Sequence, residues 1–442
     1  MLKRIKSELN QAKTDKHMIE VARGTILAFI LKVIGAGLAF AFNVAIARLL
    51  GAEGAGLFFL ALSVTAVGSV LGRVGLDNTL LRFIATHTAK GEISLVKGVY
   101  SLGMRLAITV SCALSLLGFL LSPWIAIEIF NKPALTESLQ WMSLAILPFA
   151  ILNLHGACLK GLKHIRDALL IQSISVPLFG LLFIWPLANI GGVEGVSWSY
   201  LAATIISALL GYFIWQKATI EYGANPNSYS FPFLLNSCKP LFITSLMNYA
   251  VLPWAPLVIL GIWADSQDVG IYGAASRIAM LVSFILITIN NVLAPKFAEL
   301  YAKNDFINLE KTARKSTLMI TLLASPLFIL LIFAGEWVMM LYGTEFIDGA
   351  FILTILAIGQ FINVITGSVD NLLIVTGNEL IVRNLVILGA ILQIILCLIF
   401  IPLVGMTGAA IGTAAAVATI NISSAYLVKK KIGITIIPFF VK

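Results

Sequence analysis

Four basic residues lie inside long apolar stretches of the chain, where a charge is costly. They are Lys32, Arg73, Arg105 and Arg277. A charged side chain inside a membrane costs at least about 2.5–3.5 kcal/mol, so it usually faces a cavity or a partner. The comparable acids, both near the ends of their apolar stretches, are Asp77 and Asp370. The excess of cations predicts a pocket for an anionic ligand, most simply one that carries phosphate.

Helical spacing places further polar groups beside these cations. Asn43 recurs with Lys32 on one helical face, and Asn291 recurs with Arg277 in the same way. A third polar stripe, with steps of four residues, leads to Arg73. The predicted substrate-binding side chains are therefore Lys32, Asn43, Arg73, Arg277 and Asn291.

Several of these residues have a second interpretation that the sequence leaves open. Arg73 and Asp77 have the i,i+4 spacing of an ion pair on one helix. Arg105 lies close enough to the cytoplasmic surface to extend its guanidinium into the headgroup region, and we favour that interpretation. Asp77 and Asp370 are candidate ion-coupling carboxylates for H+ or Na+, although a capping role explains Asp370 equally well.

The composition excludes a soluble globular protein. Of 442 residues, 59% are hydrophobic and 12% are charged, whereas a soluble domain has about 25% charged residues. Even a 300-residue domain buries only roughly 75% of the surface of its chain, so lipid must surround most of this one. Apolar stretches predict an all-α, polytopic membrane protein with twelve transmembrane helices, at 24–47, 54–76, 102–122, 138–159, 168–188, 194–216, 240–263, 270–292, 314–334, 347–370, 381–402 and 405–428.

The distribution of Lys and Arg predicts the orientation of these helices. Of the 30 basic residues, 24 lie in segments on the same side as the N-terminus, and only Arg48 and Lys132 lie on the other side. Cytoplasmic loops are enriched in Lys and Arg. Both termini are therefore expected in the cytoplasm, which requires an even number of membrane passes.

The two halves of the sequence are weakly similar at a separation of about 214 residues. Gly56 corresponds to Gly270 in this comparison, and Gly195 to Gly408. Each half has six predicted passes, so the two copies have the same orientation, as in transporters with parallel repeats. We expect two parallel six-helix bundles around a central cavity, with a cytoplasmic basic tail at 1–23, bundles at 24–216 and 238–428, a cytoplasmic linker at 217–237 and a second basic tail at 429–442.

Signals for several other kinds of function are missing from the sequence. There is no G-x-x-x-x-G-K-[ST] loop for nucleotide phosphates. The four cysteines are dispersed, unlike a metal site or a disulfide framework. The loops are too short for a separate catalytic or nucleic-acid-binding domain. We therefore expect no cofactor, no metal, no nucleic acid partner and no enzymatic activity.

Three segments carry a family resemblance. They are residues 47–56 (ARLLGAEGAG), residues 268–277 (DVGIYGAASR) followed by 293–295 (LAP), and residues 401–410 (IPLVGMTGAA). In order and spacing they resemble the markers of the polysaccharide transport family, the oligosaccharide flippases of the multidrug/oligosaccharidyl-lipid/polysaccharide exporter superfamily. Together the markers cover essentially the whole chain.

The resemblance implies a specific transport activity. Such a flippase moves a polyprenyl-diphosphate-linked oligosaccharide, a repeat unit of a surface polysaccharide such as O-antigen, from the inner to the outer leaflet of a prokaryotic plasma membrane by alternating access. The cationic pocket would then hold the diphosphate. The implied partners are this lipid-linked substrate, membrane lipids, H+ or Na+, and a polysaccharide polymerase.

Three alternatives stay open at this stage. A multidrug/cation antiporter of the same superfamily is expected to have more acids at membrane depth than this chain has. A membrane polysaccharide polymerase usually needs a sizeable outer loop, and the longest one here, 122–137, has three charged residues. An assembly factor that keeps the fold without transport is also compatible with the sequence.

Overall fold

The computed structural model describes residues 2–220 and 229–436, with side chains for all of these except 2–26, 291 and 292. Every regular element in this part of the chain is a helix. The N-terminal half contains α1 (Leu2–Arg73), α2 (Leu76–Ala89), α3 (Ile93–Trp124), η1 (Ile125–Ile129), η2 (Pro133–Leu135), α4 (Thr136–Leu144), α5 (Ile146–Gly161), α6 (Ile165–Leu169), η3 (Leu170–Ser175) and α7 (Val176–Thr219).

The C-terminal half continues in the same way. It contains α8 (Phe231–Leu246), η5 (Met247–Val251), α9 (Leu252–Trp263), α10 (Ser266–Ala302), α11 (Phe306–Phe333), α12 (Gly335–Met340), η6 (Thr344–Gly349), α13 (Ala350–Thr366), α14 (Val369–Val375), α15 (Glu379–Val404) and α16 (Met406–Ile432). The expected all-α membrane architecture is confirmed.

Ten helical segments in the described residues are long and apolar enough to cross a membrane. Two of them are much longer than the roughly 20 residues that one pass needs, namely Leu27–Arg73 with 47 residues and Ile165–Thr219 with 55. Each contains a glycine with positive φ, Gly51 at 68° and Gly192 at 52°, where the helix is broken. We interpret each as two passes joined at the glycine. This gives the expected twelve, a number that stays a prediction.

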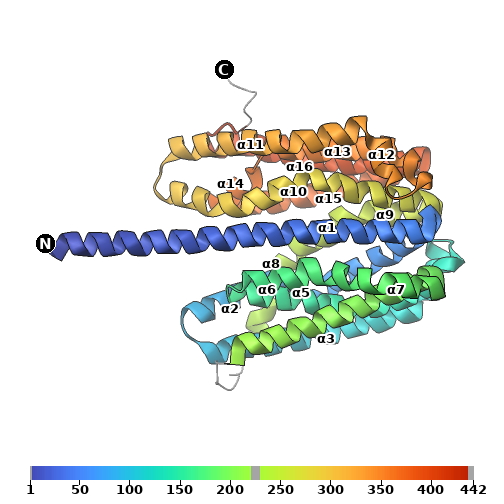
Figure 1. The fold of residues 1–442 in the computed structure, drawn as a ribbon, viewed down its shortest axis with the longest axis horizontal. Helices are drawn as coiled ribbons and strands as arrows, with labels where there is room; N and C mark the ends of the chain where they lie inside the picture. Colours follow the sequence, from blue (N-terminus) through green and yellow to red (C-terminus); the bar gives the residue numbers. More distant parts are fainter. Residues whose placement is uncertain (1, 221–228, 437–442) are drawn as a thin grey trace.

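The helices of the two halves form two groups (Figure 1). In this view α2 to α7 lie below and α10 to α16 above, with α1 running between the groups from the N-terminus. Helix α1 packs most extensively against α10 of the other half and α7 of its own. The domain limits stay predictions, and the expected linker 217–237 and tail 429–442 include residues 221–228 and 437–442, which lie outside the described part.

One predicted pass ends earlier than expected. The stretch 347–370 is not one helix, because α13 ends at Thr366 and Gly367 adopts a φ of 73°. Asp370 therefore lies on the separate short helix α14 and does not continue the face of α13. Glycine adopts positive φ without the steric cost that other residues have, and the sequence pattern did not reveal this break.

Prolines accompany irregular backbone hydrogen bonding in several helices. Pro256 has no N–H, so the carbonyl four residues earlier, that of Leu252, loses its helical donor. Gln393 Nε2 replaces that donor at 3.1 Å. The π-helical turn η3 ends two residues before Pro177, and η5 ends two residues before Pro253. Such π-helical turns are frequent at functional sites.

Candidate functional site: a cationic cavity between the two halves

Two adjoining pockets lie between the halves. The larger of the two, the central chamber, has a volume of about 500 Å³ and is lined by Lys32, Asn43 and Arg277 among others. The second, the vestibule, has a volume of about 340 Å³ and is lined by Arg73 and Asp77. Phe149, Gln172 and Trp254 line both pockets, so the two spaces share a wall. Five of the predicted site residues thus face one region.

Arg277 contributes an unpaired cation to the central chamber. Its Nη1 donates to the Gly273 carbonyl at 2.7 Å, and its guanidinium carbon lies 3.9 Å from the centre of the Phe59 ring and 5.5 Å from that of Trp254. The Nη2 atom is buried and has no hydrogen-bond partner among the described residues. Aromatic faces stabilise a desolvated cation by about 2 kcal/mol, but they leave this donor free for a ligand.

Lys32 and Asn43 line the chamber from the part of α1 that precedes the break at Gly51, its first arm. The half-buried ammonium of Lys32 has no hydrogen bond or ion pair with the rest of the described chain, and it lines the chamber with the small residues Gly35, Ala36 and Ala39. Asn43 Nδ2 donates to the Ala39 carbonyl at 2.7 Å, which leaves its Oδ1 as an acceptor. The helical face predicted from spacing is therefore present.

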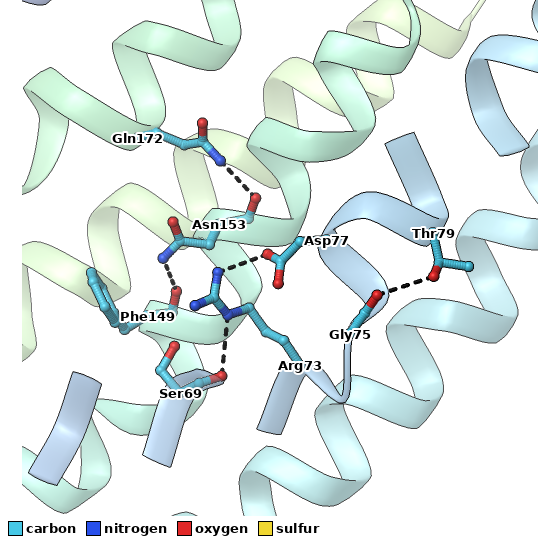
Figure 2. Close-up of polar contacts among 8 residues, drawn as sticks. All are labelled: Ser69, Arg73, Gly75, Asp77, Thr79, Phe149, Asn153 and Gln172. Carbon is cyan, nitrogen blue, oxygen red and sulfur yellow. Dashed lines mark hydrogen bonds and ion pairs between the residues drawn. The ribbon is translucent and has the colours of Figure 1, made fainter. Parts of the chain in front are cut away.

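Arg73 and Asp77 form an ion pair across a helix break in the vestibule. Arg73 Nη1 lies 2.7 Å from Asp77 Oδ1, and Arg73 Nε donates to the Ser69 carbonyl at 3.2 Å (Figure 2). The two residues do not share one helix, as the i,i+4 spacing suggested, because α1 ends at Arg73 and α2 begins at Leu76. Asp77 lies in the first turn of α2, where a negative charge is favourable.

The break itself has an unusual backbone. Val74 has a φ of 49° and Gly75 a φ of 77°. Positive φ at a β-branched residue is rare and strained, and such residues cluster at binding sites and moving parts. The Thr79 hydroxyl donates to the Gly75 carbonyl at 3.0 Å and fixes the start of α2 (Figure 2).

Amides and a further lysine complete the vestibule. Asn153 Nδ2 donates to the Phe149 carbonyl at 2.8 Å, and Gln172 Nε2 donates to the Asn153 carbonyl at 2.9 Å (Figure 2). Lys160 also lines this pocket. Sequence reasoning assigned Lys160 to a cytoplasmic loop and missed it, although Asn153, Ala157 and Lys160 have the i, i+4, i+7 spacing of one helical face.

Two predicted site residues are not placed in this cavity. Asp370 lines neither pocket, and its Oδ1 accepts from the Ser424 hydroxyl at 2.9 Å. This pairing fits the structural role that sequence left open for Asp370. The side chain of Asn291, on α10, lies outside the described part of the structure.

The charge balance of the cavity is positive. The described residues that line the two pockets include four cations, Lys32, Arg73, Lys160 and Arg277, and one acid, Asp77. No cluster of three potential metal ligands occurs in the described part of the chain. With Arg73 neutralised by Asp77, the uncompensated charges belong to Lys32, Lys160 and Arg277.

The end of the molecule that contains Gly51 is closed by polar contacts between the halves. Arg48 donates to the carbonyls of Met340 and Leu341 at 2.9 and 2.8 Å, at the end of α12. The Ala52 N–H, at the start of the second arm of α1, donates to Glu345 Oε2 at 2.7 Å. These charges complement the exposed N–H and C=O groups of helix ends.

A lysine makes the third contact of this kind. Lys132 Nζ donates to the carbonyls of Gly261 and Ala264, both at 2.8 Å, at the end of α9. Burial lowers the pKa of Lys132 from its ordinary value, and the nearby Asp265 carboxylate opposes that shift. Arg48 and Lys132 thus cap helix ends of the C-terminal half, and Glu345 caps a helix start of the N-terminal half, all on the side predicted to face outward.

Comparison with known proteins identifies the family. A family profile described as "Polysaccharide biosynthesis protein" matches residues 21–301, which is more than half of the chain. The chain belongs to this family. A second profile, MatE, matches residues 240–399. Both agree with the superfamily to which the three sequence markers pointed.

Individual relatives of this polysaccharide biosynthesis protein agree with that assignment. The chain is 24% identical over 424 residues to the probable low-salt glycan biosynthesis flippase Agl15 of Haloferax volcanii, covering 94% of this chain and 85% of the relative. Its fold resembles that of the lipid II flippase MurJ in an inward closed conformation, with a TM-score of 0.73 and 17% identity over 91% of this chain and 87% of that one.

A drug transporter has an equally similar fold. An inward-facing multidrug resistance MATE transporter of the MOP superfamily gives a TM-score of 0.74 with 14% identity, over 92% of this chain and 98% of that one. These likenesses show the fold of a multi-pass membrane transporter. The relatives are flippases and transporters by name, which agrees with the expectation that this chain catalyses no chemical reaction.

Proposed function

We propose that the protein flips a polyprenyl-diphosphate-linked oligosaccharide from the inner to the outer leaflet of the membrane. The observation that carries the proposal is the pair Lys32 and Arg277, which face one chamber from opposite halves without a carboxylate partner in the described residues. A diphosphate offers several anionic oxygens. Arginine binds such a group through two donors and lysine as a point charge.

The geometry suggests how binding couples to transport. Lys32 lies on α1 and Arg277 on α10, so a diphosphate that contacts both links the two halves. The substrate enters through the vestibule, where Lys160 supplies further positive charge. Rocking of the halves then breaks the contacts of Arg48, Ala52 and Lys132 and opens the chamber on the other side. The prenyl tail stays in lipid during this movement.

The membrane, the driving ion and the partners belong to the same proposal. The protein lies in the plasma membrane of a prokaryote with both termini in the cytoplasm, and the product passes to a polysaccharide polymerase. Asp77 and Asp370 are the carboxylates that would bind a coupling H+ or Na+. Asp77 lies in the vestibule but already neutralises Arg73, whereas Asp370 lines neither pocket and accepts from the Ser424 hydroxyl.

A second candidate function is drug/cation antiport, which the MatE match over residues 240–399 favours. A pocket for cationic drugs requires acids, and the described lining residues contain one acid, which is paired with Arg73. The charge balance therefore supports the anionic substrate.

Cells that lack the protein provide the test. We expect a polyprenyl-diphosphate-linked oligosaccharide to accumulate in them, and mass spectrometry of the lipid extract would identify it. The wild-type gene should clear the intermediate, whereas Lys32→Gln/Arg277→Gln should not, at equal protein level. Arg383→Gln, on α15 outside both pockets, is the matched control and should behave as wild type. Normal levels of lipid-linked sugars with increased sensitivity to cationic dyes would instead favour the antiporter.

A further inference from the structure

A third pocket lies on the lateral face of the N-terminal half, apart from the cationic cavity. It is a groove of about 670 Å³ between α3, α5 and α7, which we name the α3–α7 groove. Helix α5 separates it from the vestibule, because Phe149 and Asn153 line the vestibule while Pro148, Ile151 and His155 line the groove. The groove is therefore a separate space from the cavity between the halves.

Most of the groove is apolar and faces outward. Ile108 of α3 and Ile205 and Leu209 of α7 form its walls, with 43%, 43% and 52% of their surfaces exposed. Pro148 and Ala208 form part of its buried floor. On a membrane-spanning half, exposed walls of this kind contact lipid chains. A concave groove of this volume has the size of a small-molecule site.

One end of the groove is polar and cationic. Arg105 donates from Nη2 and Nε to the Ser101 hydroxyl, at 2.8 and 3.3 Å. In the described chain no carboxylate lies within ion-pair distance of this exposed guanidinium. Beside it, the Tyr100 hydroxyl and His155 Nε2 lie 3.0 Å apart.

The floor at this end is rigid. The Tyr100 ring stacks on Trp215 with 4.3 Å between the ring centres, and Trp215 is only 2% exposed. Arg105 thus lines the same groove as a well-packed tyrosine and a histidine. Such a surface positions a headgroup better than a mobile lysine or arginine on a bare helix face does.

The depth of Arg105 selects one leaflet. Arg105 is three residues after Leu102, where the predicted membrane pass begins, which corresponds to about 4.5 Å along the helix. The turn between α2 and α3 is on the side of Lys90 and Lys97, the predicted cytoplasmic side. The guanidinium therefore reaches the headgroup region of the cytoplasmic leaflet, whereas the apolar groove continues toward the membrane centre.

We propose that the α3–α7 groove binds one anionic phospholipid of the cytoplasmic leaflet, with its phosphate on Arg105 and one acyl chain in the groove. Charge complementarity selects this occupant, because the guanidinium has no acid to neutralise it and anionic lipids are concentrated in that leaflet. Since α5 has one face in this groove and the other in the vestibule, the bound lipid supports the helix that presents Asn153 to the substrate cavity.

Lipid titration of the purified, delipidated protein tests the proposal. Native mass spectrometry would follow binding of phosphatidylglycerol and of phosphatidylcholine with the same acyl chains. We expect phosphatidylglycerol to bind about fivefold more tightly, because one basic residue near a charged lipid contributes about 1 kcal/mol. Arg105→Gln should abolish this preference. Leu209→Trp, which fills the groove and keeps the arginine, should weaken binding of both lipids.

Matched variants make each outcome decisive. Arg383→Gln removes an arginine that, like Arg105, bonds to one neighbouring polar side chain, that of Asn384, and it should leave the preference intact. Ile205→Trp replaces Leu209→Trp if the latter lowers the thermal unfolding temperature. The proposal is overturned if the wild type binds the two lipids equally, if Arg105→Gln keeps the preference, or if filling the groove leaves affinity unchanged.

Discussion

At the scale of residues, the cavity differs from a set of ordinary ion pairs in having cations without partners. Arg277 is stabilised by Phe59 and Trp254, which tolerate the charge without consuming all its donors. A buried, unpaired cation costs free energy in the empty protein. The cost is reduced when an anion binds, so this residue favours the substrate-loaded state.

Removing the charge of Arg277 should therefore weaken substrate binding. We expect Arg277→Gln to raise the Kd for a polyprenyl diphosphate about 10- to 100-fold, because hydrogen bonds to charged groups contribute about 1.5–3 kcal/mol. Arg277→Lys keeps the charge but loses the planar donor pair, so its Kd should lie between those of the wild type and of Arg277→Gln. Ligand-induced shifts of the unfolding temperature would measure the affinities. An unchanged Kd in Arg277→Gln would remove Arg277 from the site.

The Arg73–Asp77 pair leads to a prediction about stability. Both side chains are largely buried, with 9% and 15% of their surfaces exposed. Asp77→Asn leaves Arg73 without its counter-charge and should cost about 3–5 kcal/mol. The thermal unfolding temperature in detergent would show the loss. Glu299→Gln, an acid in exposed ion pairs with Lys296 and Lys303, is the control and should unfold like the wild type. A small effect of Asp77→Asn would favour a coupling role over a structural one.

At the scale of helices, α1 and α10 meet where the predicted outer end is closed. A Cβ atom at Gly56 would collide with the Ser266 carbonyl, and one at Gly270 with the Ala52 carbonyl. These two glycines are the pair that the internal repeat brings into correspondence. Glycine is required at both positions because the backbones of the two halves touch directly.

Gly56→Val should disfavour the state in which the predicted outer end is closed. Overlap with a packed backbone costs about 1–3 kcal/mol, so the closed state should become at least about fivefold less populated. A cysteine at Ala39, in the chamber, should then react faster with a membrane-impermeant thiol reagent added from outside. Gly37→Val is the matched control, since a Cβ at Gly37 has no atom within 4 Å. Equal labelling of the two variants would contradict this description of the gate.

Helical periodicity explains why part of the site could be predicted. Lys32, Asn43 and Arg277 face the chamber because their spacing follows uninterrupted helix on one side of α1 and α10. Asp370 was wrongly placed along a continuous helix because the break at Gly367 depends on φ at one glycine. Lys160 was missed because a lysine beside a loop resembles the many basic residues that set topology.

At the scale of the whole molecule, duplication explains both the fold and the location of the site. Two like bundles in the same orientation must meet along one surface, and unpaired cations on that surface face each other. Apolar length predicted twelve passes, and the ten long apolar helical segments leave that number a prediction. The predicted division of Leu27–Arg73 and Ile165–Thr219 coincides with Gly51 and Gly192, which have charged residues close by, Glu53 and Glu194.

Transport by the purified protein in liposomes tests the central claim most directly. A polyprenyl-diphosphate-linked oligosaccharide would be placed in both leaflets, and its exposure followed with an impermeant enzyme that cleaves the sugar. The account predicts that wild-type protein and Arg383→Gln make nearly all of the lipid accessible, while Lys32→Gln/Arg277→Gln leaves the inner-leaflet half protected. Full accessibility with the double variant, or none with the wild type, would contradict it.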